Sequence, residues 1–189
     1  MEPTAACYIA FAGPCRLAEG PLAEVALAVK AHGEAQPQAA VLVFDACSGE
    51  QIDVDWRAAP ALAQPPRSGP GRPRLGVVAR EVTLLPRHWA WLAAQPGGAS
   101  VALRKLVEQA RRAQAPEDAR RQAQEASYRF MSAMAGNLPG FEEAARALFA
   151  ADRPRFDALA APWPEDVRQH LQRLAAPAFT AAAAEVSHA

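Results

Sequence analysis

Five prolines within sixteen residues divide this chain and limit what can form on either side of them. They stand between residues 58 and 73, together with Gly69 and Gly71, and are Pro60, Pro65, Pro66, Pro70 and Pro73. Proline fixes φ and has no amide hydrogen, so neither a helix nor a hydrogen-bonded strand runs through such a stretch. We therefore expect residues 58–73 to be a linker between separately folded parts.

Residues 5–57, before the linker, predict a small α+β domain. Residues 8–11 and 41–44 are short apolar runs of the kind that form buried strands, and residues 51–56 alternate between apolar and polar side chains. Between them, Pro21 suits the first position of a helix whose apolar residues recur at helical spacing. The order strand-strand-helix-strand-strand predicts a mostly antiparallel sheet with one helix across it.

Residues 116–176 predict a helical C-terminal part. Gly136 is expected to end its first helix, Asp152 to cap the third, and Pro164 to start the fourth. The last residues, 177–189, offer few anchors and are expected to fray. The predicted fold class is therefore α+β: a small antiparallel sheet with one helix, a central strand-helix-helix, and C-terminal helices.

The central residues, 74–113, predict one strand followed by two short helices. Val82 and Leu84 alternate with polar residues, Pro86 suits the start of a helix, and Ser100 is a candidate cap for the next one. A strand and two helices of about ten residues bury too little surface to be stable alone. We therefore expect a homodimer, because a second copy supplies the missing strand edge. The residues expected at that interface are Val82, Leu84, Trp89 and Leu106.

Two short motifs of this centre resemble the ribbon-helix-helix family of dimeric repressors. Residues 82–86 resemble the ribbon strand and the entry to its first helix, and residues 98–101 resemble the turn into its second helix. The resemblance implies that a two-chain ribbon enters the DNA major groove with Glu81, Thr83 and Leu85 facing the bases. It also implies that the turn grips a phosphate. This chain departs from the family where it places an acidic Glu81 and an apolar Leu85 in the ribbon.

Charge is distributed unevenly along the sequence. Residues 67–112 hold nine basic and two acidic side chains, a formal charge of +7 in a chain whose total is zero. Such an asymmetry indicates a polyanionic partner, and double-stranded DNA is the one we expect; plain solvated surface is the other interpretation. The residues expected to bind nucleic acid are Arg72, Arg74, Arg80, Thr83, Ser100, Arg104 and Lys105.

A wider resemblance covers nearly the whole chain. Residues 8–11, 41–45, 76–89, 96–100 and 128–141 are similar to a bacterial family catalogued as domain of unknown function 2239. This resemblance supports one coherent fold and implies no activity.

No catalytic or metal-binding pattern competes with the basic centre. The three cysteines and four histidines lack metal-site spacing, and Asp53 with Asp55 supplies too few oxygens for a hard cation. Cys15 and Cys47 meet only if the two hairpins are neighbours, and no base is identifiable beside either. We expect no cofactor, no bound metal, no membrane span and a cytoplasmic location.

The hypothesis favoured by these patterns is a dimeric nucleic-acid-binding regulatory protein. The alternative is a non-enzymatic interaction or accessory protein in which the strand-helix-helix serves dimerisation alone. An enzyme acting between the N-terminal sheet and the helical part is a third possibility, for which no residues can be nominated. Pairing of residues 82–85 with the chain's own N-terminal sheet would remove the ribbon and the DNA hypothesis together.

Overall fold

The structure is a computed structural model that describes residues 6–54, 78 and 80–186, with side chains described as far as Thr180. The predicted linker, and with it Arg72 and Arg74, lies outside these residues. The chain forms two compact units, residues 1–65 with 117–189, and residues 66–116. Each unit is therefore considered by itself.

The secondary structure confirms the predicted α+β class. The strands are β1 (Tyr8–Ala12), β2 (Cys15–Gly20), β3 (Val41–Asp45) and β4 (Gln51–Ile52), and the helices are α1 (Leu22–Ala35), α3 (Pro86–Ala93), α4 (Gly98–Ala135), α5 (Phe141–Phe149), α6 (Arg153–Ala160) and α7 (Glu165–Val186). No described helix has the length and apolar character that a membrane crossing requires.

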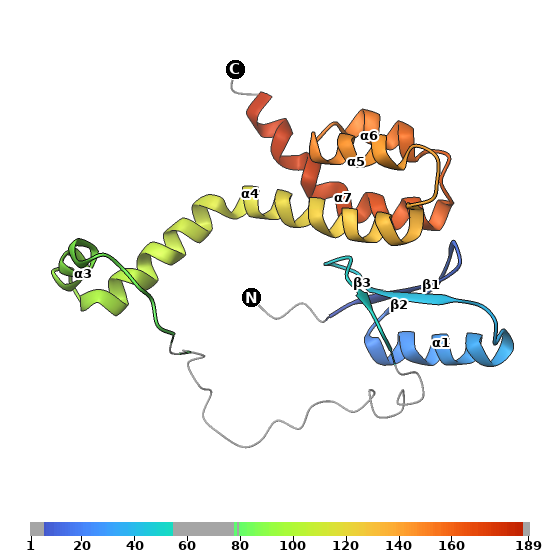
Figure 1. Cartoon of the computed structure of the whole chain (residues 1–189), viewed down its shortest axis with the longest axis horizontal. Helices are drawn as coiled ribbons and strands as arrows, with labels where there is room; N and C mark the ends of the chain where they lie inside the picture. The colour runs from blue at the N-terminus through green and yellow to red at the C-terminus, as the bar shows by residue number, and fades with distance from the viewer. Residues whose placement is uncertain (1–5, 55–77, 79, 187–189) are drawn as a thin grey trace. The chain divides into compact units, whose positions relative to one another are not determined.

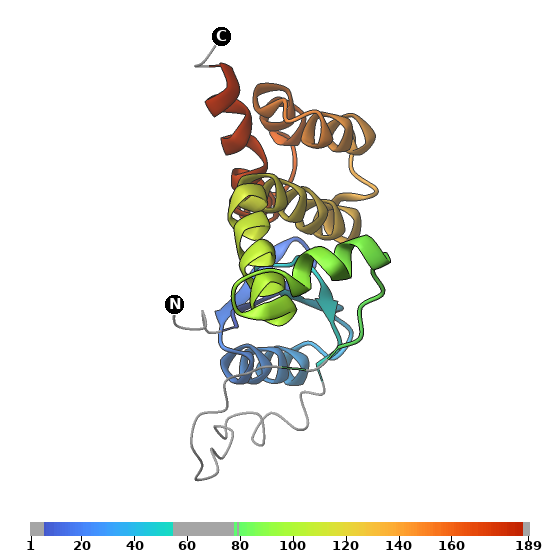
Figure 2. The same cartoon turned by 90° about the vertical axis from the view of Figure 1, so that its left-hand side faces the viewer.

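The first unit is built around an antiparallel sheet with the strand order β2-β1-β3-β4. The central strand β1 pairs on both sides, so that Tyr8 lies opposite Gly20 on β2 and Asp45 on β3. Helix α1 lies on one face of this sheet, and α7 and the part of α4 after Pro116 lie on the other (Figures 1 and 2). The edge strand β4 is shorter than the predicted 51–56 and ends at Ile52.

Side-chain alternation along β1 divides the core of this unit between the two faces of the sheet. Ala10 belongs to a small cluster on the α1 side, whereas Ile9 and Phe11 belong to the larger cluster shared with the C-terminal helices. In that larger cluster the ring centroids of Phe44 and Phe130 are 5.1 Å apart, and those of Phe11 and Phe130 are 5.5 Å apart. The N-terminal sheet and the C-terminal helices therefore share one core, because a four-stranded sheet with one helix leaves its second face apolar.

Polar contacts also join the sheet to the helices in this unit. Arg173 on α7 donates two hydrogen bonds to the Glu19 carboxylate on β2, at 2.8 and 2.9 Å. The turn after β3 lies against α4, where Arg129 donates to the Ser48 carbonyl at 3.1 Å. At Gly49, with φ of +64°, a Cβ atom would overlap the carbonyl oxygen of Ala126. Glycine is therefore required in this turn both by its backbone conformation and by the close approach of α4.

Three helix boundaries differ from the prediction. Helix α4 continues through Pro116 instead of ending before it, and Ser100 lies inside its first turn rather than at its cap. Residues 111–117 are exposed, so water can bind the carbonyl that loses its amide donor to proline. Helix α7 likewise continues through Pro177, and Phe179 packs on Phe156 with a centroid distance of 5.4 Å. The predicted frayed tail is thus helical and packed at least to Thr180.

Candidate nucleic-acid interface

Residues 80–85 lead into α3 without forming a strand in the single chain. Among the described residues, this segment pairs with no strand of the N-terminal sheet. Such pairing is what would have excluded a two-chain ribbon. Thr83 and Glu81 are exposed, Leu84 is half-buried, and Leu85 precedes α3 in an extended conformation. Pro86 starts α3 as predicted. Pairing of this segment across a two-fold axis stays a prediction.

Large apolar side chains are unusually exposed in the second unit. Among the described residues from 78 to 116, only Leu92 and Ala102 are buried. Seven of the ten exposed large hydrophobic residues of the described chain lie here, and we name them the apolar surface: Val78, Val82, Leu85, Trp89, Trp91, Leu106 and Val107. This surface contains three of the four residues predicted to form the dimer interface.

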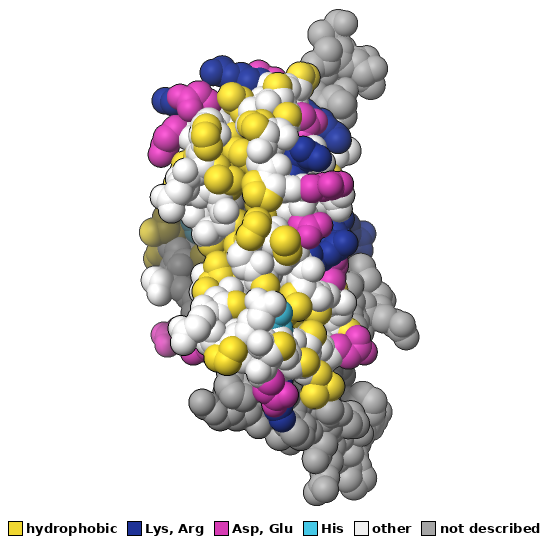
Figure 3. Space-filling view, turned by 90° about the vertical axis from the view of Figure 1, so that its right-hand side faces the viewer, with side chains coloured by type: hydrophobic (Ala, Val, Ile, Leu, Met, Phe, Trp, Pro, Cys, Tyr) yellow, Lys and Arg dark blue, Asp and Glu magenta, His cyan; other side chains and the backbone are white. Residues whose placement is uncertain are grey.

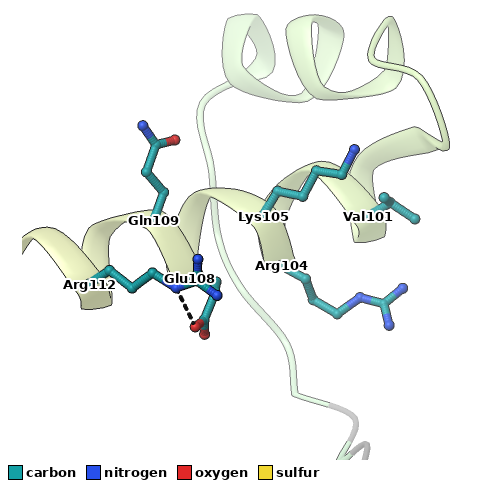
Figure 4. A pocket seen from close by; sticks show the side chains of 6 residues that line it. All are labelled: Val101, Arg104, Lys105, Glu108, Gln109 and Arg112. Atoms are coloured by element: carbon teal, nitrogen blue, oxygen red, sulfur yellow. Dashed lines mark hydrogen bonds and ion pairs between the residues drawn. The ribbon is translucent and has the colours of Figure 1, made fainter.

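The first half of α4 has two opposite faces. At 3.6 residues per turn, Arg104, Lys105, Glu108 and Arg112 fall on one side of the helix, and we name them the basic face. They line a shallow groove together with Val101 and Gln109, and Figure 4 shows these six side chains along the helix. Leu106 and Val107, which belong to the apolar surface, fall on the side away from this groove.

One carboxylate, that of Glu108, forms ion pairs with two of the arginines of this region. Glu108 accepts hydrogen bonds from Arg111 at 3.0 and 3.2 Å and from Arg112 at 3.0 Å. The Arg111 hydrogen bonds, followed by the one from Arg112, lower the pKa of the Glu108 carboxyl group. Glu108 therefore remains ionised at neutral pH and holds two guanidinium groups.

Four other cations of the second unit remain without an acidic partner among the described residues. Three of them are exposed and make no ion pair with any residue that the structure describes: Arg80, Arg87 and Lys105. The fourth, Arg104, donates only to the Ser100 carbonyl, at 3.2 Å. Arg104 and Lys105 lie in the second turn of α4, and the first turn before them has no acidic residue that could neutralise their charge.

The structure brings together some of the predicted site residues. Ser100, Arg104 and Lys105 share the first turns of α4, and Arg80 and Thr83 are exposed in the segment before α3. The sequence did not indicate that Glu108 would hold Arg111 and Arg112. Its spacing to them, three and four residues, is the signal by which it can be found.

The first unit has a different charge pattern. On the face shown in Figure 3, acidic and basic side chains are interspersed. On its helices Arg121 pairs with Asp118, and Arg146 with Glu143, each three residues away. Most basic side chains in the described part of the first unit are therefore paired with an acidic one, and the exceptions are Arg155 and Arg168.

Comparison with known proteins identifies a family. A family model described as "Uncharacterized protein conserved in bacteria (DUF2239)" matches residues 7–175. The chain belongs to this family. No curated protein matches it, and no solved structure matches it. The DUF2239 match extends from β1 into α7, so it includes both the sheet and the basic face.

A second polar cluster of this DUF2239 protein was not predicted. Cys7, Glu19, His170 and Arg173 interact electrostatically across β1, β2 and α7, although they are far apart in sequence. Arg173 Nη2 is 3.3 Å from His170 Nδ1, and His170 Nε2 is buried without a partner. Burial, followed by the charge of Arg173, lowers the pKa of His170 to about 4. This imidazole is therefore neutral at physiological pH.

The cysteines do not form the arrangement considered from the sequence. Cys15 pairs with Ala12 at one end of β1, whereas Cys47 follows Asp45, which pairs with Tyr8 at the other end. The two hairpin turns therefore lie apart, and Cys15 and Cys47 do not meet. Burial raises the pKa of the Cys7 thiol, which keeps it protonated and weakly nucleophilic.

Proposed function

We propose that this DUF2239 protein is a homodimer that binds nucleic acid and acts in regulation, with the second unit as both its dimer interface and its binding surface. One observation carries the proposal: the second unit contains both the apolar surface and basic side chains that have no acidic partner among the described residues. The three free cysteines suit the reducing cytoplasm, where we expect the protein to act.

The apolar surface supports a dimer. Val107 is 64% exposed, Trp91 53% and Trp89 40%, and such a concentration on a short segment is unfavourable in water. A second copy covers the surface with an identical one, so a single two-fold axis buries both. Residues 80–85 then have a partner edge, as the ribbon-helix-helix resemblance implies.

The basic face supports a polyanionic partner. Because Leu106 and Val107 lie on the side of α4 away from the groove, a dimer formed through them leaves Arg104 and Lys105 in solvent. Each chain contributes the same cations, so dimerisation doubles the charge presented to one ligand. Phosphates of a nucleic acid duplex are the ligand that this pattern fits best.

Sedimentation with a fluorescently labelled duplex tests both parts of this proposal. The protein alone is expected at twice the 20.1 kDa mass of the chain, and a complex is expected at low salt. Leu106→Glu should give a monomer that binds the duplex weakly, because a charge at the interface opposes association. Leu27→Glu is the matched control, since Leu27 is equally an exposed leucine, 51% exposed, but lies on α1. A monomeric wild-type protein at high micromolar concentration would refute the dimer.

A specific observation favours a second candidate function. Glu108 holds two of the arginines, and Glu81 is exposed in the segment expected to face DNA. Both carboxylates repel phosphates, which suits an accessory protein that uses this unit for dimerisation only. A stable dimer that binds no duplex at low salt would support this second function.

A further inference from the structure

We infer that the basic face of α4 holds nucleic acid through the phosphates, without reading base sequence, and that Glu108 limits the strength of this binding. The inference rests on the proposed function and specifies its ligand and its contacting element.

The basic face matches a phosphate backbone in length and charge. Arg104 and Arg112 are eight residues apart on α4, which corresponds to about 12 Å along a helix. One strand of duplex DNA carries about one phosphate per 3.4 Å of axis, so this length faces roughly three to four phosphates. The face presents the free cations Arg104 and Lys105 against them, and it also contains Arg112, which Glu108 holds.

The segment before α3 is poorly suited to reading bases. Base edges in the major groove are distinguished mainly by arginine, lysine, asparagine and glutamine, which donate to defined positions. Residues 81–85 offer none of these side chains, and Val82 and Leu85 are 53% and 49% exposed. Arg111 and Arg112 direct donors to Glu108 instead. Arg104 and Lys105 are the cations left free on α4, and we assign them to phosphates because the segment before α3 supplies no base-reading donors.

Glu108 reduces the affinity in two ways. Its carboxylate repels phosphates, and it occupies two guanidinium groups that would otherwise donate to them. Substitution of Glu108 by Gln removes the charge and releases Arg111 and Arg112. If one released guanidinium in each chain of a dimer then contacts a phosphate of the duplex, the affinity for the duplex rises about 60-fold at 0.1 M salt.

The chain contains only two lysines, Lys105 and Lys30, which permits a direct test of the contact. Lys105 lies on the basic face, and Lys30 lies on α1, where its Nζ is 4.0 Å from Glu34. Acetylation with an amine-reactive reagent, read by mass spectrometry, should be slowed by duplex DNA at Lys105 and unchanged at Lys30. Equal labelling of Lys105 in the free protein and in a demonstrated complex would overturn the inference while leaving nucleic-acid binding intact.

Affinity measurements complete the test. Fluorescence anisotropy with duplexes of equal length and unrelated sequence should give the same dissociation constant within a few-fold, and Glu108→Gln should bind each of them more tightly. Glu143→Gln, which breaks the equivalent pair with Arg146 on α5, is the matched control and should bind like the wild type. A preference above tenfold for one sequence, or no gain from Glu108→Gln, would contradict the inference. Absence of all duplex binding at low salt would instead refute the proposed function itself.

Discussion

Protonation of His170 is expected to destabilise the first unit in mild acid. The side chain is 2% exposed, its ring centroid is 4.6 Å from that of Phe130, and its Nδ1 faces the Arg173 guanidinium. Burial and the Arg173 charge lower its pKa from 6.5 to about 4 in the folded chain, while Glu19 opposes this shift and Arg16 adds to it. In the unfolded chain the imidazole returns to its ordinary pKa.

The sign and size of the effect follow from linkage. Between pH 6.5 and 4 the unfolded chain binds a proton that the folded chain resists, so stability decreases as the pH falls through this range. Above pH 6.5 the imidazole is neutral in both states, so His170 does not make the stability depend on pH. The difference between a pKa of 6.5 in the unfolded chain and about 4 in the folded chain corresponds to about 3 kcal/mol, a large part of the stability of a small domain.

Urea unfolding at several pH values measures this contribution. The comparison is with His170→Gln, which retains an acceptor for Arg173 but does not titrate. The stability of the wild type relative to this variant should fall by about 3 kcal/mol between pH 7 and pH 4. Glu19 has a pKa that is lowered chiefly by its hydrogen bond from Arg173. It titrates in both proteins, so its contribution to the pH dependence cancels in the comparison. A difference that stays constant with pH, or an NMR titration of His170 near 6.5, would refute this reasoning.

Three further substitutions test the packing of the first unit by urea unfolding. Phe130→Ala should cost about 3–5 kcal/mol, because Phe130 is 0% exposed between Phe11 and Phe44, and a loss below 1 kcal/mol would contradict this packing. Gly49→Ala should destabilise by at least about 1–3 kcal/mol because of its φ of +64° and the overlap with α4, and wild-type stability would show that this turn is not docked. Gln124→Leu should cost about 1–3 kcal/mol, since Gln124 Nε2 donates to the carbonyls of Leu148 and Phe149, and no loss would mean that water replaces it.

Local patterns in the sequence predicted the elements of the first unit well. The apolar runs at 8–11 and 41–44 are β1 and β3, and Asp152 caps α6 by accepting from the Arg155 amide at 3.1 Å. These features depend on neighbouring residues only. The continuity of α4 through Pro116 was not predicted, because the cost of a proline depends on whether water reaches the freed carbonyl.

Contacts between distant residues were not accessible from the sequence. The bidentate contact of Arg173 with Glu19 joins residues 154 positions apart, and no periodicity marks such a pair. The basic centre was recognised from composition, but its division into free cations and cations held by Glu108 needed the helix geometry. The exposure of Leu106 and Val107 likewise became visible only when the fold left them uncovered.

The salt dependence of duplex binding tests the central claim most directly. If the dimer presents Arg104 and Lys105 twice, four phosphate contacts give a slope of about −3.6 in a plot of log association constant against log salt. Affinity should then fall by roughly 150-fold between 50 and 200 mM salt. The account predicts this steep loss, measured by anisotropy with a labelled duplex. Binding that is insensitive to salt, or no binding at 50 mM salt, would contradict it.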